Sequence, residues 1–332
     1  MALFKKNINL VSENNTGFGV NSENSGGRFV TIDGKPNVEK RGMSVFERYS
    51  WYHTMLSLPR WKFFLFIFLV YVLINLFFAV VYFTLGVEHL GGINKGTSFH
   101  NFIESFFFSA QTFTTVGYGR INPVGYTASS IAAFEAFLGL LAFALATGLL
   151  YGRFSKPKAY LKFSGNALIA PFKDSIAIMF RMVPFKNNLL TEVEVKVTLA
   201  MRINENGKLI NKFFSLPLEI SKLSSLSLSW TIVHPIDNNS PLYGFTENDF
   251  KINYLELIAI VRGFDEDYSN TVVTRSSYSN SEIIYGAKFN MMYHADIGKK
   301  KTILELDKLN DFEKAVLPIV PVISSATEKV LS

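Results

Sequence analysis

Residues 114–123 read TTVGYGRINP, a polar stretch broken by two glycines that lies between the two most apolar segments of the chain. The first apolar segment, 63–85, contains no charged residue, and the second, 126–151, contains only Glu135. Because roughly 20 apolar residues rising 1.5 Å each cross the hydrocarbon core of a bilayer, both segments are long enough to span a membrane. The sequence therefore predicts a membrane protein with two spanning helices.

The composition agrees with this prediction. Of the 332 residues, 48% are hydrophobic and 32 are phenylalanine, which is more apolar than an ordinary soluble domain. About sixty mostly polar residues precede the first span, so that span is not a signal peptide. The net charge of +6 does not favour a nucleic-acid partner, and the lack of cysteine excludes disulfides and thiolate metal sites. No catalytic constellation is evident, so we expect neither an enzyme nor a cofactor.

The basic residues predict the orientation. Basic residues precede the first span and follow the second, while the segment between the spans carries only Lys95 and Arg120. By the positive-inside rule both termini should be cytoplasmic. The flanking residues would form a basic ring under the inner leaflet that recognises anionic lipid, although positive-inside flanking alone would place the same residues there. These residues are Arg60, Lys62, Arg153, Lys156 and Lys158.

The segment between the spans is predicted to re-enter the membrane. Residues 98–113 form an apolar run of helix length with Ser98 as the expected N-cap, and the run is too short to cross a bilayer. The C-terminus of such a half-helix carries a partial negative charge, which suits a cation. Irregular backbone at membrane depth is tolerated where it lines an ion or water path. Residues 114–119 are therefore expected to line one.

Residues 115–119 read TVGYG, the sequence of the potassium-channel selectivity filter. Glycines permit conformations that aim successive carbonyls one way, while the valine and tyrosine pack outward. We expect K⁺ to be held by the oxygens of Thr115, Val116, Gly117 and Tyr118, with Gly119 closing the filter. One strand cannot form a ring, so a homotetramer is implied.

The remainder, 154–332, is predicted to be a β-sandwich. Residues 191–200 alternate apolar and polar side chains, which is typical of a half-buried strand, and Asn206-Gly207 is a hairpin-turn signal. Further strand-like runs at turn-punctuated spacing support the prediction, and they lie at 214–220, 226–233, 254–263 and 270–278.

The chain resembles the inward-rectifier potassium channels, most closely the bacterial KirBac type. The resemblance rests on FFFSAQTFTTVGYG (106–119), FEAFLGLLAFALATGLLYGRFSKP (134–157), SLSWTIVHPIDNNSPLYG (227–244), RFVTIDGKPNV (28–38) and RSSY (275–278). It implies a membrane α fold, with two transmembrane helices and a re-entrant pore helix, followed by a C-terminal cytoplasmic immunoglobulin-like β-sandwich. It also implies an amino-terminal β-strand at 28–38 with a turn at Asp33-Gly34, and a structural loop, not a catalytic one, around His234 and Asp237.

The resemblance assigns roles to residues of the second span. Gly139 matches a hinge glycine, and Phe143 and Tyr151 match positions that narrow the cytoplasmic end of the pore, where rings of aromatic side chains would gate by dewetting. The alternative is that these aromatics only pack helix to helix. Strongly rectifying relatives carry an acidic residue at the position of Phe143, so we do not expect strong rectification through that site.

Two further positions stay open. Glu135 is either a functional carboxylate within the membrane or a buried, hydrogen-bonded group behind the filter. Gln111 stands where many relatives carry a glutamate that pairs with an arginine beyond the filter, and both Gln111 and Glu135 are expected to support the pore. Arg120 directly follows Gly119, and Glu104 is its candidate partner.

The predicted organisation has four parts. Residues 1–43 are a cytoplasmic amino-terminal segment with a strand, and 44–58 an interfacial slide helix. Residues 59–153 form the pore domain, with spans at 61–85 and 126–153, a pore helix at 98–113 and the filter at 115–119. Residues 154–332 form the regulatory sandwich.

We expect a potassium channel of a bacterial inner membrane, regulated by anionic lipid or phosphoinositide and gated by the inner-helix aromatics and the cytoplasmic domain. The alternatives are an unselective cation channel and a membrane-anchored sensor whose pore does not conduct.

Overall fold

The computed structural model describes residues 27–42, 44, 50–205 and 208–318. The chain divides into two compact units. A helical unit comprises Lys40–Lys156, and a sandwich unit comprises Met1–Glu39 together with Pro157–Ser332.

The helical unit contains two helices that are long and apolar enough to cross a membrane, and between them a short helix that is not. The elements are α3 (Trp51–Ser57), α4 (Arg60–Leu85), η1 (Val87–His89), β1 (Leu90–Gly91), α5 (Ser98–Phe113), β2 (Asn122–Pro123) and α6 (Gly125–Phe154). The predicted pair of spanning helices with a half-helix between them is therefore confirmed.

The start of α5 differs from the prediction in one detail. The N-cap is Thr97, whose hydroxyl accepts a hydrogen bond from the backbone N–H of His100 at 3.3 Å. Ser98 is already helical, so the prediction of an N-cap at Ser98 was wrong. Thr97 has the extended backbone that a cap requires, and its side chain reaches the third helical N–H.

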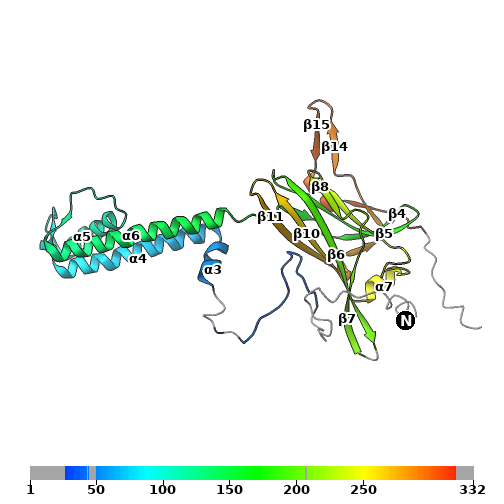
Figure 1. Cartoon of the computed structure of the whole chain (residues 1–332), viewed down its shortest axis with the longest axis horizontal. Coiled ribbons are helices and arrows are strands. Elements are labelled where there is room, and N and C mark those ends of the chain that lie inside the picture. The colour runs from blue at the N-terminus through cyan, green and yellow to red at the C-terminus, as the bar shows by residue number, and fades with distance from the viewer. Residues whose placement is uncertain (1–26, 43, 45–49, 206–207, 319–332) are drawn as a thin grey trace, which may run out of the picture. The chain divides into compact units, whose positions relative to one another are not determined.

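The helices α4, α5 and α6 pack together through an aromatic-rich contact (Figure 1). The Tyr82 ring of α4 lies 4.8 Å from the Phe108 ring of α5 in an edge-on arrangement, and Ala132 of α6 joins the same buried cluster. Antiparallel pairing of β1 with β2 joins the segment after α4 to the segment before α6. The loop around α5 is thus fastened at both of its ends.

The short helix α3 packs on the end of α6. Ser50 caps it, Met55 is buried, and the Tyr52 hydroxyl and the Leu56 side chain lie beside Gly152 of α6. Of the predicted slide helix at 44–58, residues 45–49 lie outside the described residues.

The sandwich unit has two five-stranded sheets. The first has the order β11-β10-β6-β7 with β8 paired to β6, and the second has the order β12-β4-β5-β3 with β9 paired to β5. The long strands β6 and β10 run side by side, and β14 and β15 form a projecting hairpin (Figure 1). The strands of the first sheet are β6 (Leu190–Glu205), β7 (Lys208–Ser215), β8 (Lys222–Leu226), β10 (Leu255–Asp265) and β11 (Asn270–Ser279).

The second sheet is mixed. Strand β12 pairs with β4 in parallel, whereas the pairs that β5 forms with β3, β4 and β9 are antiparallel. Its strands are β3 (Leu161–Phe163), β4 (Ala167–Phe172), β5 (Ser175–Pro184), β9 (Trp230–Pro235) and β12 (Ile283–Tyr285). The remaining elements are α7 (Glu247–Ile252), η2 (Asn280–Glu282), β13 (Ala287–Phe289), β14 (Tyr293–Asp296), β15 (Lys301–Leu304), η3 (Leu306–Asn310) and β16 (Phe312–Lys314).

The core lies between the sheets and contains the alternating side chains of β6. Val193, Val195, Val197 and Leu199 are all buried there, together with residues of β5 such as Phe180. The predicted alternation and the β-sandwich are confirmed. The alternation arises because successive side chains of a strand face opposite sides of the sheet.

Some strand predictions need correction. Residues 214–220 are not one strand, because β7 ends at Ser215 and Pro217, which has no backbone N–H to give to a ladder, lies in the following connection. Residues 226–233 are divided between the end of β8 and the start of β9. The turn at Asn206-Gly207 lies outside the described residues, although the flanking pair Glu205 and Lys208 is in register.

The amino-terminal segment 28–38 has the turn expected at Asp33-Gly34, where the Gly34 N–H donates to the backbone oxygen of Thr31 at 2.8 Å. Its only ladder contact among the described residues is an isolated bridge between Val30 and Pro36. Gly34 has a positive φ of 75°, and a Cβ added there would lie 2.3 Å from the backbone oxygen of Arg275. Only glycine fits this approach to β11, and the segment closes into a turn there.

Candidate ion pathway and its supports

The backbone of the TVGYG segment alternates in the sign of φ. Thr115, Gly117 and Gly119 have positive φ angles of 59°, 53° and 81°, whereas neither Val116 nor Tyr118 has a positive φ. Alternating left- and right-handed residues bring successive N–H groups to one side of the chain and the carbonyls to the other. A left-handed conformation costs a non-glycine residue such as Thr115 roughly 1–2 kcal/mol, so the segment must be held in place.

Gln111 of α5 provides that hold. Its backbone oxygen accepts hydrogen bonds from the N–H of Val116 at 3.0 Å and of Gly117 at 3.3 Å. Its side-chain amide donates to the backbone oxygen of Ile121 at 3.3 Å. One residue thus contacts the chain within the filter segment and just after it.

The filter segment has little cover within one chain. Tyr118 is 84% exposed and Val116 53% exposed, beside a cleft of about 520 Å³ between α4, α5 and the segment. On α6, Phe143 and Tyr151 are 73% and 74% exposed. Large apolar side chains exposed in this number indicate surfaces that other chains or lipid cover.

Beyond the filter, Arg120 pairs with Glu104. The guanidinium donates to Glu104 Oε2 at 2.6 Å, and the other carboxylate oxygen lies 3.9 Å from His100 Nε2. This contact answers the open question of the arginine's partner, which is the candidate Glu104. Gly92 makes room for the segment, because a Cβ there would lie 1.7 Å from the backbone oxygen of Arg120.

Behind the filter segment, Glu135 of α6 lies in a buried polar cluster. Tyr82 donates to its Oε2 at 2.7 Å, and the Ser109 hydroxyl lies 2.5 Å from its Oε1. The same hydroxyl lies 3.0 Å from Asn75 Oδ1. All four side chains are fully buried. The sequence left two interpretations of Glu135 open, and the structure has the features of the second, a buried and hydrogen-bonded group.

Gly139 lies against the end of α5. A Cβ at this position would meet the backbone oxygen of Phe113 at 1.9 Å, so any larger residue would separate the two helices. This packing explains the glycine without a hinge, and the hinge remains a prediction.

The basic residues predicted to bind lipid differ in their surroundings. Arg60, Lys62, Lys156 and Lys158 are exposed. Arg153 donates to the backbone oxygens of Leu58 at 2.5 Å and Met55 at 3.3 Å, which are carbonyls at the end of α3, and it stacks on the Phe63 ring. Its guanidinium therefore fastens α3 to α6. Lys158 belongs to the sandwich unit and the others to the helical unit.

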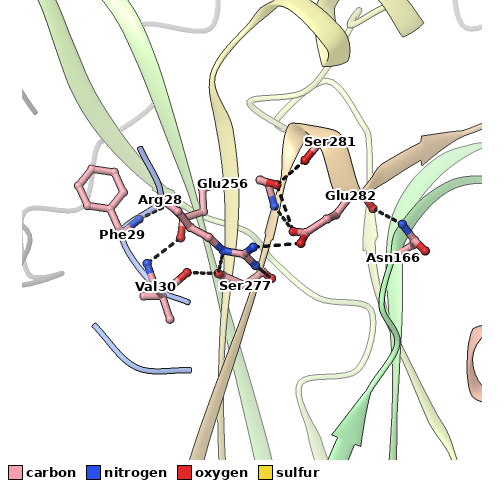
Figure 2. A network of polar contacts seen from close by, with 9 residues as sticks. Arg28, Phe29, Val30, Asn166, Glu256, Ser277, Ser281 and Glu282 are labelled. Atoms are coloured by element: carbon pink, nitrogen blue, oxygen red, sulfur yellow. Dashed lines mark hydrogen bonds and ion pairs between the residues drawn. The ribbon is translucent and has the colours of Figure 1, made fainter. Parts of the chain in front are cut away.

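In the sandwich unit a second buried carboxylate, Glu256 of β10, holds the amino-terminal segment (Figure 2). It accepts hydrogen bonds from the backbone N–H groups of Phe29 at 2.6 Å and Val30 at 2.9 Å. Ser277 of β11 donates to the backbone oxygen of Val30 at 2.6 Å. Arg28 spans from Ser277 to the carboxylate of Glu282, which it meets at 3.0 Å.

Sequence reasoning missed this anchor. Its signal was a glutamate, Glu256, within the otherwise apolar run Leu255–Val261. The partner lies 227 residues away along the chain, so no local pattern could identify it.

His234 is a structural residue of the sandwich, as expected. Its ring nitrogens contact the backbone oxygen of Pro217 at 2.6 Å and the hydroxyl of Ser240 at 2.8 Å. Burial lowers the pKa of His234, against the opposing effects of the Pro217 carbonyl and Asp237.

The fold and the site together define a cation channel with a β-sandwich attached. Family models agree: the model described as "Inward rectifier potassium channel C-terminal domain" matches residues 161–329, and the model described as "Ion channel" matches residues 62–156. The chain belongs to the inward rectifier potassium channel family, which is a family of ion channels and not a class of enzymes.

Individual relatives support the assignment. The inward rectifier potassium channel Kirbac3.1 of Paramagnetospirillum magnetotacticum is 32% identical over 267 residues, covering 79% of this chain and 88% of the relative. The ATP-sensitive inward rectifier potassium channel 12 of Bos taurus and that of Homo sapiens are each 27% identical over 286 residues. These alignments cover 79% of this chain and 66% and 65% of the two relatives.

Proposed function

We propose that this chain is one subunit of a homotetrameric channel that conducts K⁺ passively through Thr115–Gly119. The observation that supports the proposal is the alternation in the sign of φ along this segment, a pattern that allows successive carbonyl oxygens to face one side. Four such segments around an axis would surround a dehydrated K⁺ with oxygens from Thr115, Val116, Gly117 and Tyr118. In such a tetramer, neighbouring subunits would cover the Tyr118 side chain, which is exposed in the single chain.

The gate of the proposed channel is formed by α6. Phe143 and Tyr151 are exposed in the single chain and are free to face the axis, where four copies would make an apolar constriction. Gln111 and Glu135 support the filter from α5 and α6, and Gly139 keeps α6 in contact with the end of α5.

Anionic lipid is the proposed regulator, in a bacterial inner membrane with both termini in the cytoplasm. The exposed Arg60, Lys62, Lys156 and Lys158 supply the positive charge, each contributing about 1 kcal/mol near an anionic surface. Arg153 has a different part in this proposal, because its guanidinium is engaged with the carbonyls of α3. We expect no cofactor beyond the permeant ion, no nucleic-acid partner and no enzymatic activity.

The test is ion flux into liposomes that contain the purified full-length protein. Uptake of K⁺ and Rb⁺ that Ba²⁺ blocks and that Na⁺ does not replace is the expected result. Repeating the assay with phosphoinositide added to neutral lipid gives the direction of regulation. Equal uptake of Na⁺ would support an unselective channel instead, and no uptake by a verified tetramer in any lipid would support the sensor.

A further inference from the structure

The hydrogen-bond cluster around Glu135 can be examined by counting hydrogens. Asn75 Nδ2 donates to the backbone oxygen of Tyr71 at 2.7 Å, which fixes Asn75 Oδ1 as the atom that faces Ser109. The Ser109 hydroxyl has one hydrogen, yet it lies 3.0 Å from Asn75 Oδ1 and 2.5 Å from Glu135 Oε1. If Glu135 were ionised, both neighbours could only accept, and one of these contacts would join two oxygens with no hydrogen between them.

A proton on Glu135 Oε1 resolves the conflict. Glu135 then donates to Ser109, Ser109 donates to Asn75 Oδ1, and Tyr82 donates to Glu135 Oε2. Every contact in the cluster contains one hydrogen, which is the condition that buried polar groups meet in stable structures.

We infer that Glu135 is a neutral carboxylic acid and that, by linking α4, α5 and α6, it is a positioning residue for the pore helix. The neutral form also suits its surroundings, because an unpaired charge at membrane depth is costly. The chain Tyr82–Glu135–Ser109–Asn75 contains one residue from α6, one from α5 and two from α4. Glu135 thus links α4, α5 and α6 through one chain of hydrogen bonds.

The charged groups on these helices do not compensate an ionised Glu135. Arg60 and Lys62 lie in the first turn of α4, roughly 20 Å along the helix from Asn75, and Arg153 lies roughly 27 Å from Glu135 along α6. On α5, Glu104 pairs with Arg120 and lies near His100. In the part of the chain that the structure describes, no basic group is within ion-pair distance of Glu135.

The charge state has a direct test that does not depend on conduction. Infrared spectra of the full-length protein in lipid, wild type minus E135Q at neutral pH, should contain the C=O stretch of a protonated carboxylic acid. A difference that contains only carboxylate bands would overturn the inference. Because this readout needs no ion flux, it stands even if the proposed channel function fails.

The positioning role rests on the proposed function, and its test is flux. A glutamine reproduces the inferred pattern, because its Nε2 can donate to Ser109 while its oxygen accepts from Tyr82. E135Q should therefore conduct K⁺ within about twofold of wild type, whereas S109A, which removes the central hydroxyl, should lose about tenfold or more.

The matched control is S105A on the same helix. Ser105 is also fully buried, but its hydroxyl donates only to the backbone oxygen of Asn101 within α5. S105A should remain within about twofold of wild type. Loss of flux in a folded, tetrameric E135Q as large as that in S109A would overturn the inference.

Discussion

Among the residues that the structure describes, three carboxyl groups are fully buried: Glu135 between the membrane helices, and Glu256 and Asp265 in the sandwich. Glu135 and Glu256 differ in their hydrogen-bond partners. Each oxygen of Glu256 accepts from a backbone N–H group, which can only donate (Figure 2), and Oε2 also accepts from the Tyr254 hydroxyl at 3.2 Å. Glu135 faces hydroxyls, which can donate or accept. Because an N–H group can only donate, both oxygens of Glu256 must accept. Because a hydroxyl can also accept, Glu135 can be a neutral acid that donates to one of its partners. The comparison shows that burial alone does not determine the chemistry of a carboxyl group.

The largest expected effect concerns the helix contact beside Glu135. In G139A the new methyl group would meet the Phe113 backbone oxygen at 1.9 Å, and a backbone atom within a packed helix cannot easily move. We expect a loss of about 3 kcal/mol or more in the free energy of unfolding, together with loss of the tetramer. Thermal unfolding and size-exclusion chromatography measure both.

Gly148 provides the control, since it lies in α6 and a Cβ there meets nothing within 4 Å. G148A should be neutral or slightly stabilising, because alanine favours a helix over glycine by up to about 1 kcal/mol. If the two variants behaved alike, the packing role of Gly139 would be wrong.

The second prediction applies the same substitution to both carboxyl groups. In E256Q the amide NH₂ would face a backbone N–H, so two donors would meet with no acceptor between them. We expect this to lower the free energy of unfolding by about 1–3 kcal/mol. E135Q should instead change the stability by less than about 0.5 kcal/mol, because it keeps the inferred pattern. Thermal unfolding in lipid compares the two, with the exposed Glu266 as the E266Q control. Equal losses of stability in E135Q and E256Q would contradict the difference between the two carboxyl groups.

The third prediction concerns pH. Burial lowers the pKa of His234 below its ordinary value of 6.5, so the unfolded chain takes up a proton at a higher pH than the folded chain does. The contribution of His234 to stability is complete above about pH 6.5 and is lost as the pH falls from there through the lower folded pKa. At about pH 5.5 we expect a loss of up to about 1 kcal/mol.

Thermal unfolding of wild type and H234Q at about pH 7.5 and pH 5.5 checks this sign. The difference between the two pH values should be smaller in H234Q and unchanged in H294Q, which removes an exposed histidine. A wild type that gains stability on acidification relative to H234Q would contradict the assignment.

The smallest expected effect concerns the exposed pair beyond the filter. In E104Q, Arg120 loses its partner and adds positive charge near the outer end of the proposed filter, which lowers the local concentration of K⁺. Flux should fall about twofold at low ionic strength and recover at high salt, because salt screens exposed charges. The double variant E104Q/R120Q should restore flux at low salt. A deficit that does not depend on salt would indicate a structural role for the pair.

Local patterns in the sequence were sufficient for much of the fold. The two apolar spans, the half-helix between them and the alternation at Val193–Leu199 each follow from neighbouring residues, so each could be predicted. The cap at Thr97 was placed one residue too late because serine and threonine are both good caps and adjacent.

Contacts between distant residues could not be predicted in the same way. The anchoring of Phe29 by Glu256 and the engagement of Arg153 with α3 depend on how elements pack, which no spacing rule encodes. For Glu135 the sequence identified an unusual residue and left two interpretations, and only the geometry around Ser109 decided between them.

The central claim is that Thr115–Gly119 forms a potassium-selective filter. The most direct measurement is the reversal potential of the full-length protein in a planar bilayer with K⁺ on one side and Na⁺ on the other. A potassium-selective filter gives a reversal potential far from zero, with the sign that K⁺ flow out of its own compartment produces, and a current that Ba²⁺ blocks. A reversal potential near zero in a conducting bilayer would contradict it.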